Sequence, residues 1–233
     1  MWRRGGNEST SAVKIEVFPD PDAVALRAAE RIAAASRAGV AARGRFAAAV
    51  SGGRTPWAML RALLALDVPW AQADWFQVDE RIAPAGDPDR NLTHLRECLP
   101  AQARIHAMPV ESPNLDAAAA DYALSLAPVL DLVHLGLGPD GHTASLVPGD
   151  AVLGVADRDV ALTGPYQGRR RMTLTYPVLD RAREILWLVT GADKADMLVR
   201  LRDGDRSIPA GRVRSERAIA LVDRDAASGL EKH

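Results

Sequence analysis

The feature that most constrains the fold of this chain is a regular alternation between short β-type runs and alanine-rich helical runs. Residues 13–18 (VKIEVF) alternate apolar and polar side chains, as a strand with one buried face does, whereas residues 131–137 (DLVHLGL) are mostly apolar, as is a strand buried on both faces. Strands that alternate with helices form a mostly parallel sheet with helices on both faces. We therefore predict an α/β fold with a single domain over residues 13–226 and loose tails at 1–12 and 227–233.

The same patterns give the expected elements. Strands are predicted at 13–18, 45–51, 74–78, 104–108, 131–137, 172–176, 184–190 and 218–222, and helices at 23–37, 55–66, from about 91, 115–126 and 193–202. In sheets of this class, ligands bind beyond the carboxyl ends of the strands. A motif that directly follows a predicted strand is therefore a candidate for the functional site.

Charge and cysteine content narrow the functional classes. Lys and Arg number 29 and Asp and Glu number 30, a formal net charge of -1, so no global basic field is available for nucleic acid or a membrane surface. No apolar run approaches the roughly 20 residues that a spanning helix needs, and no apolar segment of a secretory signal follows the N-terminal arginines. The single cysteine, Cys98, excludes an internal disulfide and favours a cytoplasmic location.

A glycine pair, Gly52–Gly53, follows the strand at 45–51 and precedes a helix that opens at Thr55. Glycines let a backbone come close to a ligand, and a helix N-terminus adds a positive end. The N–H groups of Gly52, Gly53 and Thr55 are thus a candidate phosphate cradle, although a GxxxxGK loop and a GxGxxG fingerprint are both lacking. A tight strand-to-helix turn with a Thr cap explains the glycine pair alone equally well.

Three charges, Asp79-Glu80-Arg81, follow the strand at 74–78. An isolated charge triplet is more often simply solvated. In a functional site, Arg81 would grip a phosphate or carboxylate through two hydrogen bonds, and Asp79 would orient a base or accept a sugar hydroxyl. Asn91, beyond the following loop, is expected to cap the next helix rather than add a polar contact to the site.

The segment 136–146 (GLGPDGHTASL) follows the most apolar strand and contains His142. Its glycines, proline and Asp-Gly step make a specialised backbone. A histidine here can titrate near neutral pH, and Asp140 is close enough to fix its tautomer. A lone loop histidine is more often structural, but the glycine density favours function. Thr143 and Ser145 are rival nucleophiles, but covalent catalysis is less favoured because no GxSxG elbow is present.

Basic residues gather in the last third of the chain. Arg169, Arg170 and Arg171 precede the strand at 172–176, and Lys194 opens the helix that follows 184–190. A dianionic phosphate needs about two such charges to offset its desolvation, although a solvated edge is the expected role for at least one of the three arginines. His134, inside a strand, is expected to be structural. Without HxxxH or CxxC spacing, no metal site is predicted.

These motifs, in this order, make the chain resemble the 6-phosphogluconolactonase family. SGGRTP, DER with a downstream Asn, GLGPDGHTASLVPG, RMTLT and VTGADKA occur there at similar spacing, and the resemblance runs from about residue 13 to 226. It departs at Arg54, Arg90 and Val147, of which Arg54 and Arg90 are expected to alter the pocket rim. The resemblance implies a Rossmann-like fold of the sugar-phosphate isomerase type, a monomer, and cofactor-free hydrolysis of 6-phosphogluconolactone in the oxidative pentose phosphate pathway.

The resemblance also implies a mechanism. The 6-phosphate of the substrate would be bound by the glycine loop and by Arg81 with Arg171 or Lys194. His142 would take a proton from the attacking water, with Asp140 or Asp79 steadying the imidazole.

Two other functions are weighed against the lactonase. The related glucosamine-6-phosphate deaminase/isomerase family shares the SGG loop, the Asp–Glu pair and the GxGxDGH loop, but usually continues with an IAFNEP-like stretch. TASLVPG after the histidine and Arg81 after Asp-Glu favour the lactonase. A non-catalytic sugar-phosphate-binding domain of a transcription regulator is less favoured, because the chain has no basic face to spare for DNA.

Overall fold

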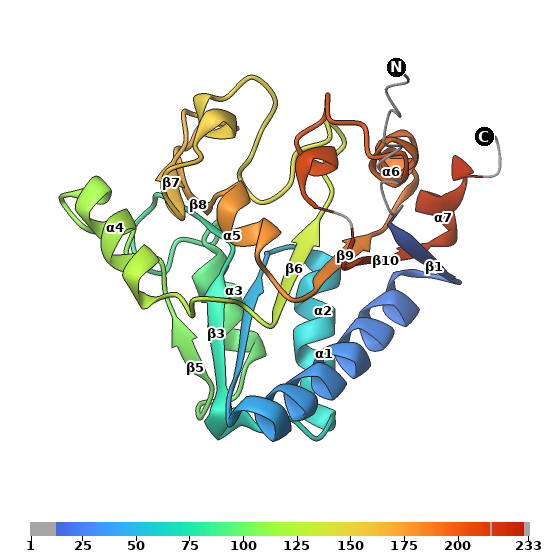
Figure 1. Ribbon diagram of the computed structural model, residues 1–233, viewed down its shortest axis with the longest axis horizontal. Helices are drawn as coiled ribbons and strands as arrows, with labels where there is room; N and C mark the ends of the chain where they lie inside the picture. The colour runs from blue at the N-terminus through green and yellow to red at the C-terminus, as the bar shows by residue number, and fades with distance from the viewer. Residues whose placement is uncertain (1–12, 215, 231–233) are drawn as a thin grey trace, which may run out of the picture.

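A parallel sheet forms the centre of the protein (Figure 1). In the computed structural model, which describes residues 13–214 and 216–230, seven strands lie in the order β1-β10-β9-β6-β2-β3-β5, and all neighbouring pairs are parallel. Their bounds are β1 Lys14–Phe18, β2 Phe46–Val50, β3 Ala73–Gln77, β5 Arg104–His106, β6 Leu132–Gly136, β9 Ile185–Val189 and β10 Ala218–Asp223. The predicted fold class, a mostly parallel α/β sheet, is confirmed. The strand order reverses between β2 and β6, and such a point is where open sheets of this kind bind ligands.

Helices cover both faces of this sheet, as predicted. One face packs against α1 (Pro21–Arg43), α2 (Arg54–Ala62) and α3 (Asn91–Cys98). The other packs against α4 (Leu115–Ser125), α5 (Tyr176–Asp180), α6 (Ala195–Arg202) and α7 (Arg224–Ala227). Short 3₁₀ helices complete the chain: η1 Leu63–Ala65, η2 Trp70–Gln72, η3 Ala151–Gly154, η4 Ala192–Lys194 and η5 Ala210–Arg212.

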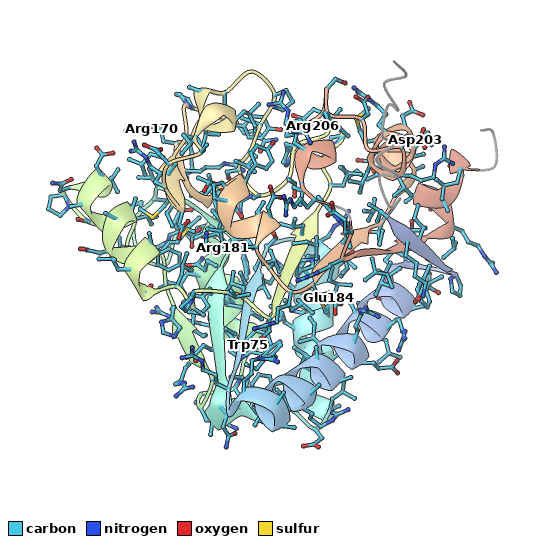
Figure 2. All side chains as sticks on the ribbon, viewed as in Figure 1. Trp75, Arg170, Arg181, Glu184, Asp203 and Arg206 are labelled. Carbon is cyan, nitrogen blue, oxygen red and sulfur yellow. The ribbon has the colours of Figure 1, made fainter. Side chains whose placement is uncertain are left out.

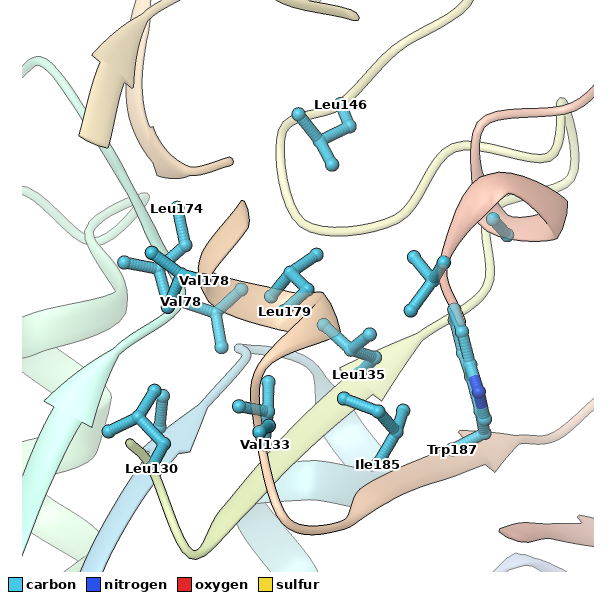
Figure 3. Close-up of a cluster of buried hydrophobic side chains, with 14 of the residues drawn as sticks. Val78, Leu130, Val133, Leu135, Leu146, Leu174, Val178, Leu179, Ile185 and Trp187 are labelled. Atoms are coloured by element: carbon cyan, nitrogen blue, oxygen red, sulfur yellow. The ribbon is translucent and has the colours of Figure 1, made fainter. Parts of the chain in front are cut away.

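The period of two along each strand separates the two cores. In β2, Phe46 and Ala48 enter the core under α1, in which Trp75 is buried, while Ala47 and Ala49 enter the opposite core. Figure 2 shows Trp75 within the sheet layer. In the opposite core, side chains from β6 and β9 meet those of α5 and of the loop after β6 (Figure 3); they include Val133, Leu135, Ile185, Trp187, Val178, Leu179 and Leu146.

The loop after β6 is fixed by this second core. Leu146 at its end is fully buried, and burial of a leucine side chain stabilises the fold by roughly 1.5–3 kcal/mol. The core therefore holds the loop that carries His142 against the sheet.

A second, smaller sheet stands beside the carboxyl end of β3. It is antiparallel, with the order β4-β8-β7 and the bounds β4 Asp79–Arg81, β8 Arg171–Leu174 and β7 Val160–Leu162. The strand expected at 172–176 therefore belongs to this sheet and ends at Leu174, after which the Tyr176–Pro177 step opens α5. The sequence did not reveal β4 and β7 because β4 consists only of charged residues and β7 only of apolar ones, so neither shows a period of two.

Helices α1 and α2 depart most from their predicted bounds. Helix α1 runs to Arg43 because its alanine-rich sequence continues to Gly44, which ends it with a φ of 74°. The Asp20 side chain caps its start by accepting from the Ala23 N–H at 2.8 Å. Helix α2 ends at Ala62 and tightens into η1.

The expected tails are only partly described. Residues 1–12 and 231–233 lie outside the described residues. Residues 227–230 were expected to be loose, but this is wrong, because Ala227 ends α7 and Leu230 packs against the core. None of the helices in the described part of the chain has the length and apolarity needed to cross a membrane.

Candidate active site

Four segments meet at the carboxyl edge of the main sheet. Residues 51–55 follow β2, Asp79–Arg81 follows β3, residues 137–146 follow β6 and residues 190–194 follow β9. Because β9, β6, β2 and β3 are consecutive in the sheet, these segments are neighbours. They line two adjoining cavities of about 460 and 220 Å³, which share Gly52, Gly136, Leu137 and Lys194.

The smaller cavity gathers most of the predicted site residues. It is lined by His142, Asp79, Arg81, Arg171, Lys194 and Gly52, together with Asn91 and Ser51. The larger cavity holds the remaining predicted residues, Gly53 and Thr55, with Gly52 and Lys194 at the junction. Asp140 lines neither of these two cavities and acts on the site through its contact with His142.

His142 is paired with Asp140. The imidazole Nδ1 lies 2.5 Å from Asp140 Oδ1, and the His142 backbone N–H donates to the same oxygen at 3.1 Å. Burial raises the pKa of Asp140, but the hydrogen bonds from His142 outweigh it and the net pKa is lowered. A carboxylate at Nδ1 keeps the ring proton on that nitrogen, which leaves the Nε2 lone pair free to accept a proton.

Glycine is required beside the imidazole. A Cβ on Gly138 would lie 2.0 Å from His142 Nδ1, and the Gly138 N–H donates to the His142 carbonyl at 2.8 Å. Gly141 has a φ of 81°, and a Cβ there would lie 2.7 Å from Ile208 Cβ. Two of the glycines that singled out this loop are thus explained, Gly138 by its contact with the histidine and Gly141 by its backbone conformation and its contact with Ile208.

Thr143 and Ser145, considered as nucleophiles, lie in the interior. Thr143 is 1% and Ser145 0% exposed, and the Ser145 hydroxyl donates to Asp79 Oδ2 at 2.5 Å. Neither hydroxyl is accessible to a ligand in the cavity, so the covalent alternative finds no support in the fold.

Asp79 lines the cavity, but its carboxylate is bound by other groups. Oδ2 accepts from Ser145, and Oδ1 lies 3.3 Å from the Asn91 amide nitrogen. The described contacts of His142 therefore involve Asp140 rather than Asp79.

Asn91 does not cap α3, and that expectation is wrong. It is the first residue of the helix, and its side chain donates to the Asp79 carbonyl at 2.9 Å and accepts from Arg81 Nη1 at 2.7 Å. Its Oδ1 also packs so closely on Gly52 that a Cβ there would lie 2.0 Å away. Asn91 therefore ties the glycine loop to the small sheet, and this position explains the need for Gly52.

The small sheet presents two arginines to the same cavity. Arg81 and Arg171 are directly opposite each other in the β4–β8 register, where like charges oppose folding. Arg171 is only 5% exposed, and burial lowers its pKa. Two facing guanidinium groups at a cavity wall form a site that an anion stabilises.

The remaining basic residues fall into two groups, those that line the cavities of this site and those that do not. Lys194 lines both cavities, although its Nζ donates to Asp193 at 2.7 Å. Of the three consecutive arginines, Arg171 alone lines a described cavity of this site. Arg169 pairs with Asp87 and Asp89, and Arg170, at the small sheet in Figure 2, donates to the Thr163 carbonyl.

The two arginines that depart from the family pattern have different surroundings. Arg54 lines the larger cavity, in agreement with a place at the rim. Arg90 is 2% exposed, forms ion pairs with Glu80 and Glu111, and lines a separate cavity beside Met108, so its expected place at the rim is wrong.

The glycine loop leads into the N-terminus of α2, for which the structure shows no side-chain cap. Gly53 precedes the helix with a φ of 133°, and the Thr55 hydroxyl lies 2.9 Å from that of Thr190. Free N–H groups at a helix start attract anions. The glycine loop, Lys194 and the arginine pair thus line two adjoining cavities that share Gly52 and Lys194.

His134 is structural, as expected. It is fully buried, and burial lowers its pKa to about 3. Its Nδ1 accepts a hydrogen bond from the Ser51 N–H at 3.2 Å. The imidazole joins the ends of β2 and β6, where the ladder between these strands stops at Ala49 and Val133. Among the described residues, no group of three or more metal-ligating side chains is present.

Sequence reasoning missed two residues at this site, Glu80 and Tyr166. Glu80 was treated only as one charge of a triplet, but it is fully buried and accepts hydrogen bonds from the backbone N–H groups of Arg81, Asn91 and Leu92. Tyr166 lies in a turn and contacts Asp140 and His142. An aromatic residue between turn formers (GPYQG) was the available signal.

Comparison with known proteins places these observations in a family context. A family model described as glucosamine-6-phosphate isomerases/6-phosphogluconolactonase matches residues 19–221. The 6-phosphogluconolactonase of Mycobacterium tuberculosis is 37% identical over 242 residues, which cover 93% of this chain and 98% of that protein.

Solved structures agree with this match. The 6-phosphogluconolactonase from Shewanella baltica superposes with a TM-score of 0.84 at 26% identity and covers 92% of this chain and 99% of its own. A monomeric glucosamine-6-phosphate deaminase has a TM-score of 0.79 at 18% identity over 93% of this chain and 100% of its own, which shows a shared fold alone.

Proposed function

The chain belongs to the glucosamine-6-phosphate isomerase/6-phosphogluconolactonase family, and we propose that His142 is the general base of its lactone hydrolysis. The reaction is the hydrolysis of 6-phosphogluconolactone to 6-phosphogluconate, a step of the pentose phosphate pathway. The observation that carries the proposed chemistry is that His142, held by Asp140, lines the same cavity as the facing arginines Arg81 and Arg171. A base and an anion site lie within one small volume.

The phosphate of the substrate is bound at the junction of the two cavities. The N–H groups of Gly52, Gly53 and Thr55 at the start of α2 approach it from one side. Arg81 and Arg171 approach it from the small sheet, and Lys194 from the end of β9. A bound dianion removes the repulsion between the two arginines, so phosphate affinity and local stability are coupled.

The phosphate contacts hold the lactone carbonyl above His142. His142 Nε2 takes a proton from water while the water oxygen bonds to the carbonyl carbon. The oxyanion so formed is stabilised by loop N–H groups or by a neighbouring cation. As it collapses, the bond between the carbonyl carbon and the ring oxygen breaks, and the imidazolium returns its proton to that oxygen. Asp140 holds the ring throughout, and the product acid then loses a proton to solvent.

The base is tested with His142→Gln. Because general base catalysis contributes about 10²–10⁴-fold, kcat should fall at least about 100-fold while 6-phosphogluconate still binds. The lactone is generated by glucose-6-phosphate dehydrogenase, and its disappearance is corrected for spontaneous hydrolysis. His106→Gln, which removes a histidine paired with Asp74 outside both cavities, is the control. Near-normal turnover of His142→Gln would contradict the proposal.

The phosphate site is tested by comparing phosphorylated with unphosphorylated gluconolactone. Arg171→Ala and Lys194→Ala should each lose about 10-fold or more in kcat/KM on the phosphorylated lactone, and much less on the other, since a charge-assisted contact provides roughly 1.5–3 kcal/mol. Arg158→Ala, an exposed arginine paired with Asp157, is the control. Equal losses on both substrates would show that these residues do not bind phosphate. Ammonia release from glucosamine 6-phosphate tests the deaminase alternative.

We also propose that the protein acts as a monomer in the cytoplasm. The single cysteine, Cys98, is buried and can form no internal disulfide, which supports a reducing compartment. Light scattering coupled to size exclusion measures the mass in solution, and a dimer mass would contradict the monomer.

A further inference from the structure

A hairpin between β7 and β8 places Tyr166 beside the catalytic pair. Tyr166 and Arg169 exchange two backbone hydrogen bonds of 2.9 and 3.2 Å around Gln167 and Gly168, whose φ values are 51° and 79°. Positive φ at both central residues forms the tight turn that matches the twist of a hairpin. Arg169 also pairs with Asp87 and Asp89, so the residue that is hydrogen-bonded to Tyr166 across the turn is itself anchored.

The phenol contacts both members of the catalytic pair. Its hydroxyl donates to Asp140 Oδ2 at 3.1 Å and lies 3.4 Å from His142 Nδ1. The Tyr166 and His142 rings meet edge to face, with centroids 5.4 Å apart at 64°. Asp140 thus divides its two oxygens between His142 and Tyr166.

The other contact of the Tyr166 ring is Arg171. The guanidinium carbon of Arg171 lies 4.9 Å from the ring centroid, and Arg171 Nη2 donates to Gln167 in the same turn at 3.2 Å. A cation on an aromatic face is held most strongly where water is excluded, and Arg171 is 5% exposed. One side chain therefore contacts both the base and a cation of the phosphate site.

We propose that Tyr166 is a positioning residue that sets the basicity of the His142–Asp140 pair and holds Arg171 in place for the substrate phosphate. This inference rests on the proposed function. Burial and the charge of Asp140 raise the pKa of Tyr166, which keeps the phenol a donor at working pH.

The hydroxyl and the ring have separable effects. A hydrogen bond from the phenol spreads the negative charge of Asp140, so its loss leaves a carboxylate that stabilises the imidazolium more strongly. The acid limb of the activity profile then moves to higher pH. Loss of the ring frees Arg171, which weakens phosphate binding. The other charged groups that face His142 across the cavity, Asp79, Arg81 and Lys194, are unchanged by substitutions at Tyr166.

Two substitutions separate these effects. Tyr166→Phe should move the acid midpoint of kcat/KM upward by about 0.5 pH unit, the size expected for one hydrogen bond, and leave KM within about twofold. Tyr166→Leu should show the same displacement together with a KM about 5-fold higher or more, the size of a partly buried cation–π contact. Tyr176→Phe, which removes a hydroxyl bonded to the Pro209 carbonyl, is the control and should match the unmodified protein.

The titration of the His142 ring, followed by NMR, gives a readout that does not depend on activity. Its signal is assigned by its loss in His142→Gln, and in Tyr166→Phe it should titrate at higher pH. An unmoved titration, or equal KM values for the Phe and Leu variants, would overturn the inference. If the unmodified protein hydrolysed no phosphorylated lactone, the proposed function would fail, whereas a displaced ring titration would still support the contact between Tyr166 and the pair.

Discussion

The buried carboxylate of Glu80 should contribute more to stability than any other single side chain beside the site. Its Oε1 accepts from the N–H groups of Arg81 and Asn91, and its Oε2 accepts from Leu92 N–H and Gln77 Nε2, all at 2.8 Å. Glu80 thus joins the end of β4 to the first turn of α3, whose free N–H groups need acceptors.

Glu80→Gln changes one of these oxygens to an amide nitrogen. Whichever way the amide lies, two donors lose their acceptor and face another donor. Each hydrogen bond to a charged group contributes roughly 1.5–3 kcal/mol, so the loss should be about 3–6 kcal/mol. That is a large part of the roughly 5–15 kcal/mol that separates a folded domain from its unfolded chain.

Urea unfolding followed by tryptophan fluorescence measures this loss. Glu111→Gln is the matched control, because Glu111 is the second partner of Arg90 but is 54% exposed, and exposed pairs contribute about 1 kcal/mol or less. A loss below about 1 kcal/mol for Glu80→Gln, with the slope of the unfolding curve unchanged, would refute the reasoning.

Three further outcomes are expected. Gly138→Ala places a Cβ 2.0 Å from His142 Nδ1, so kcat/KM should fall about 100-fold because the imidazole ring is displaced. Gly154→Ala, which has open space at its Cβ, is the control and should be active. Equal activities of the two variants would contradict the packing argument. Burial lowers the pKa of His134 to about 3, below the value near 6.5 of an unfolded chain. The unfolded state therefore binds the proton first, and the free energy of unfolding falls as the pH drops below about 6.5. Between about pH 7 and pH 5, urea titrations should show that the unmodified protein loses about 2 kcal/mol more than His134→Leu. Ala144 has a φ of 51°, so Ala144→Gly should raise the urea midpoint, corresponding to about 1 kcal/mol, and a lowered midpoint would show that the backbone there is not strained.

The main sheet and the loops at its edge were predictable because their signals are local. Each of the strands β2, β3, β6 and β9 is an apolar run that ends in glycine or in charged residues, and the carboxyl ends of parallel strands share one edge. His142, Asp140 and the glycine loop could therefore be assigned to one site without knowledge of the strand order. Lys194 followed from the same argument, since it lies just after β9.

The small sheet was not predictable, because its pairing is non-local. Asp79–Arg81 and Arg171–Leu174 are about ninety residues apart, and although a strand was predicted at 172–176, nothing in either segment indicates that the two pair in register. The roles of Asn91 and Glu80 depend on that pairing, so the sequence suggested a cap for the first and a solvated charge for the second. For the same reason, only the family resemblance, and no local pattern, favoured Arg171 over Arg169 and Arg170.

The structure also shows why the site needs both sheets. His142 and the glycine loop belong to the main sheet, whereas Arg81 and Arg171 belong to the small one. Val78 joins them: its N–H donates to the Val50 carbonyl at the end of β2, and its carbonyl accepts from the Leu174 N–H at the end of β8. Val78 is fully buried beside Leu174 (Figure 3). Because one residue is hydrogen-bonded to both sheets, the distance between His142, the proposed base, and the facing arginines is set by backbone geometry. Under the proposed mechanism, a substrate whose phosphate and lactone carbonyl match that distance is bound in the reacting position, and a lactone without the phosphate lacks one of the two contacts that place it there.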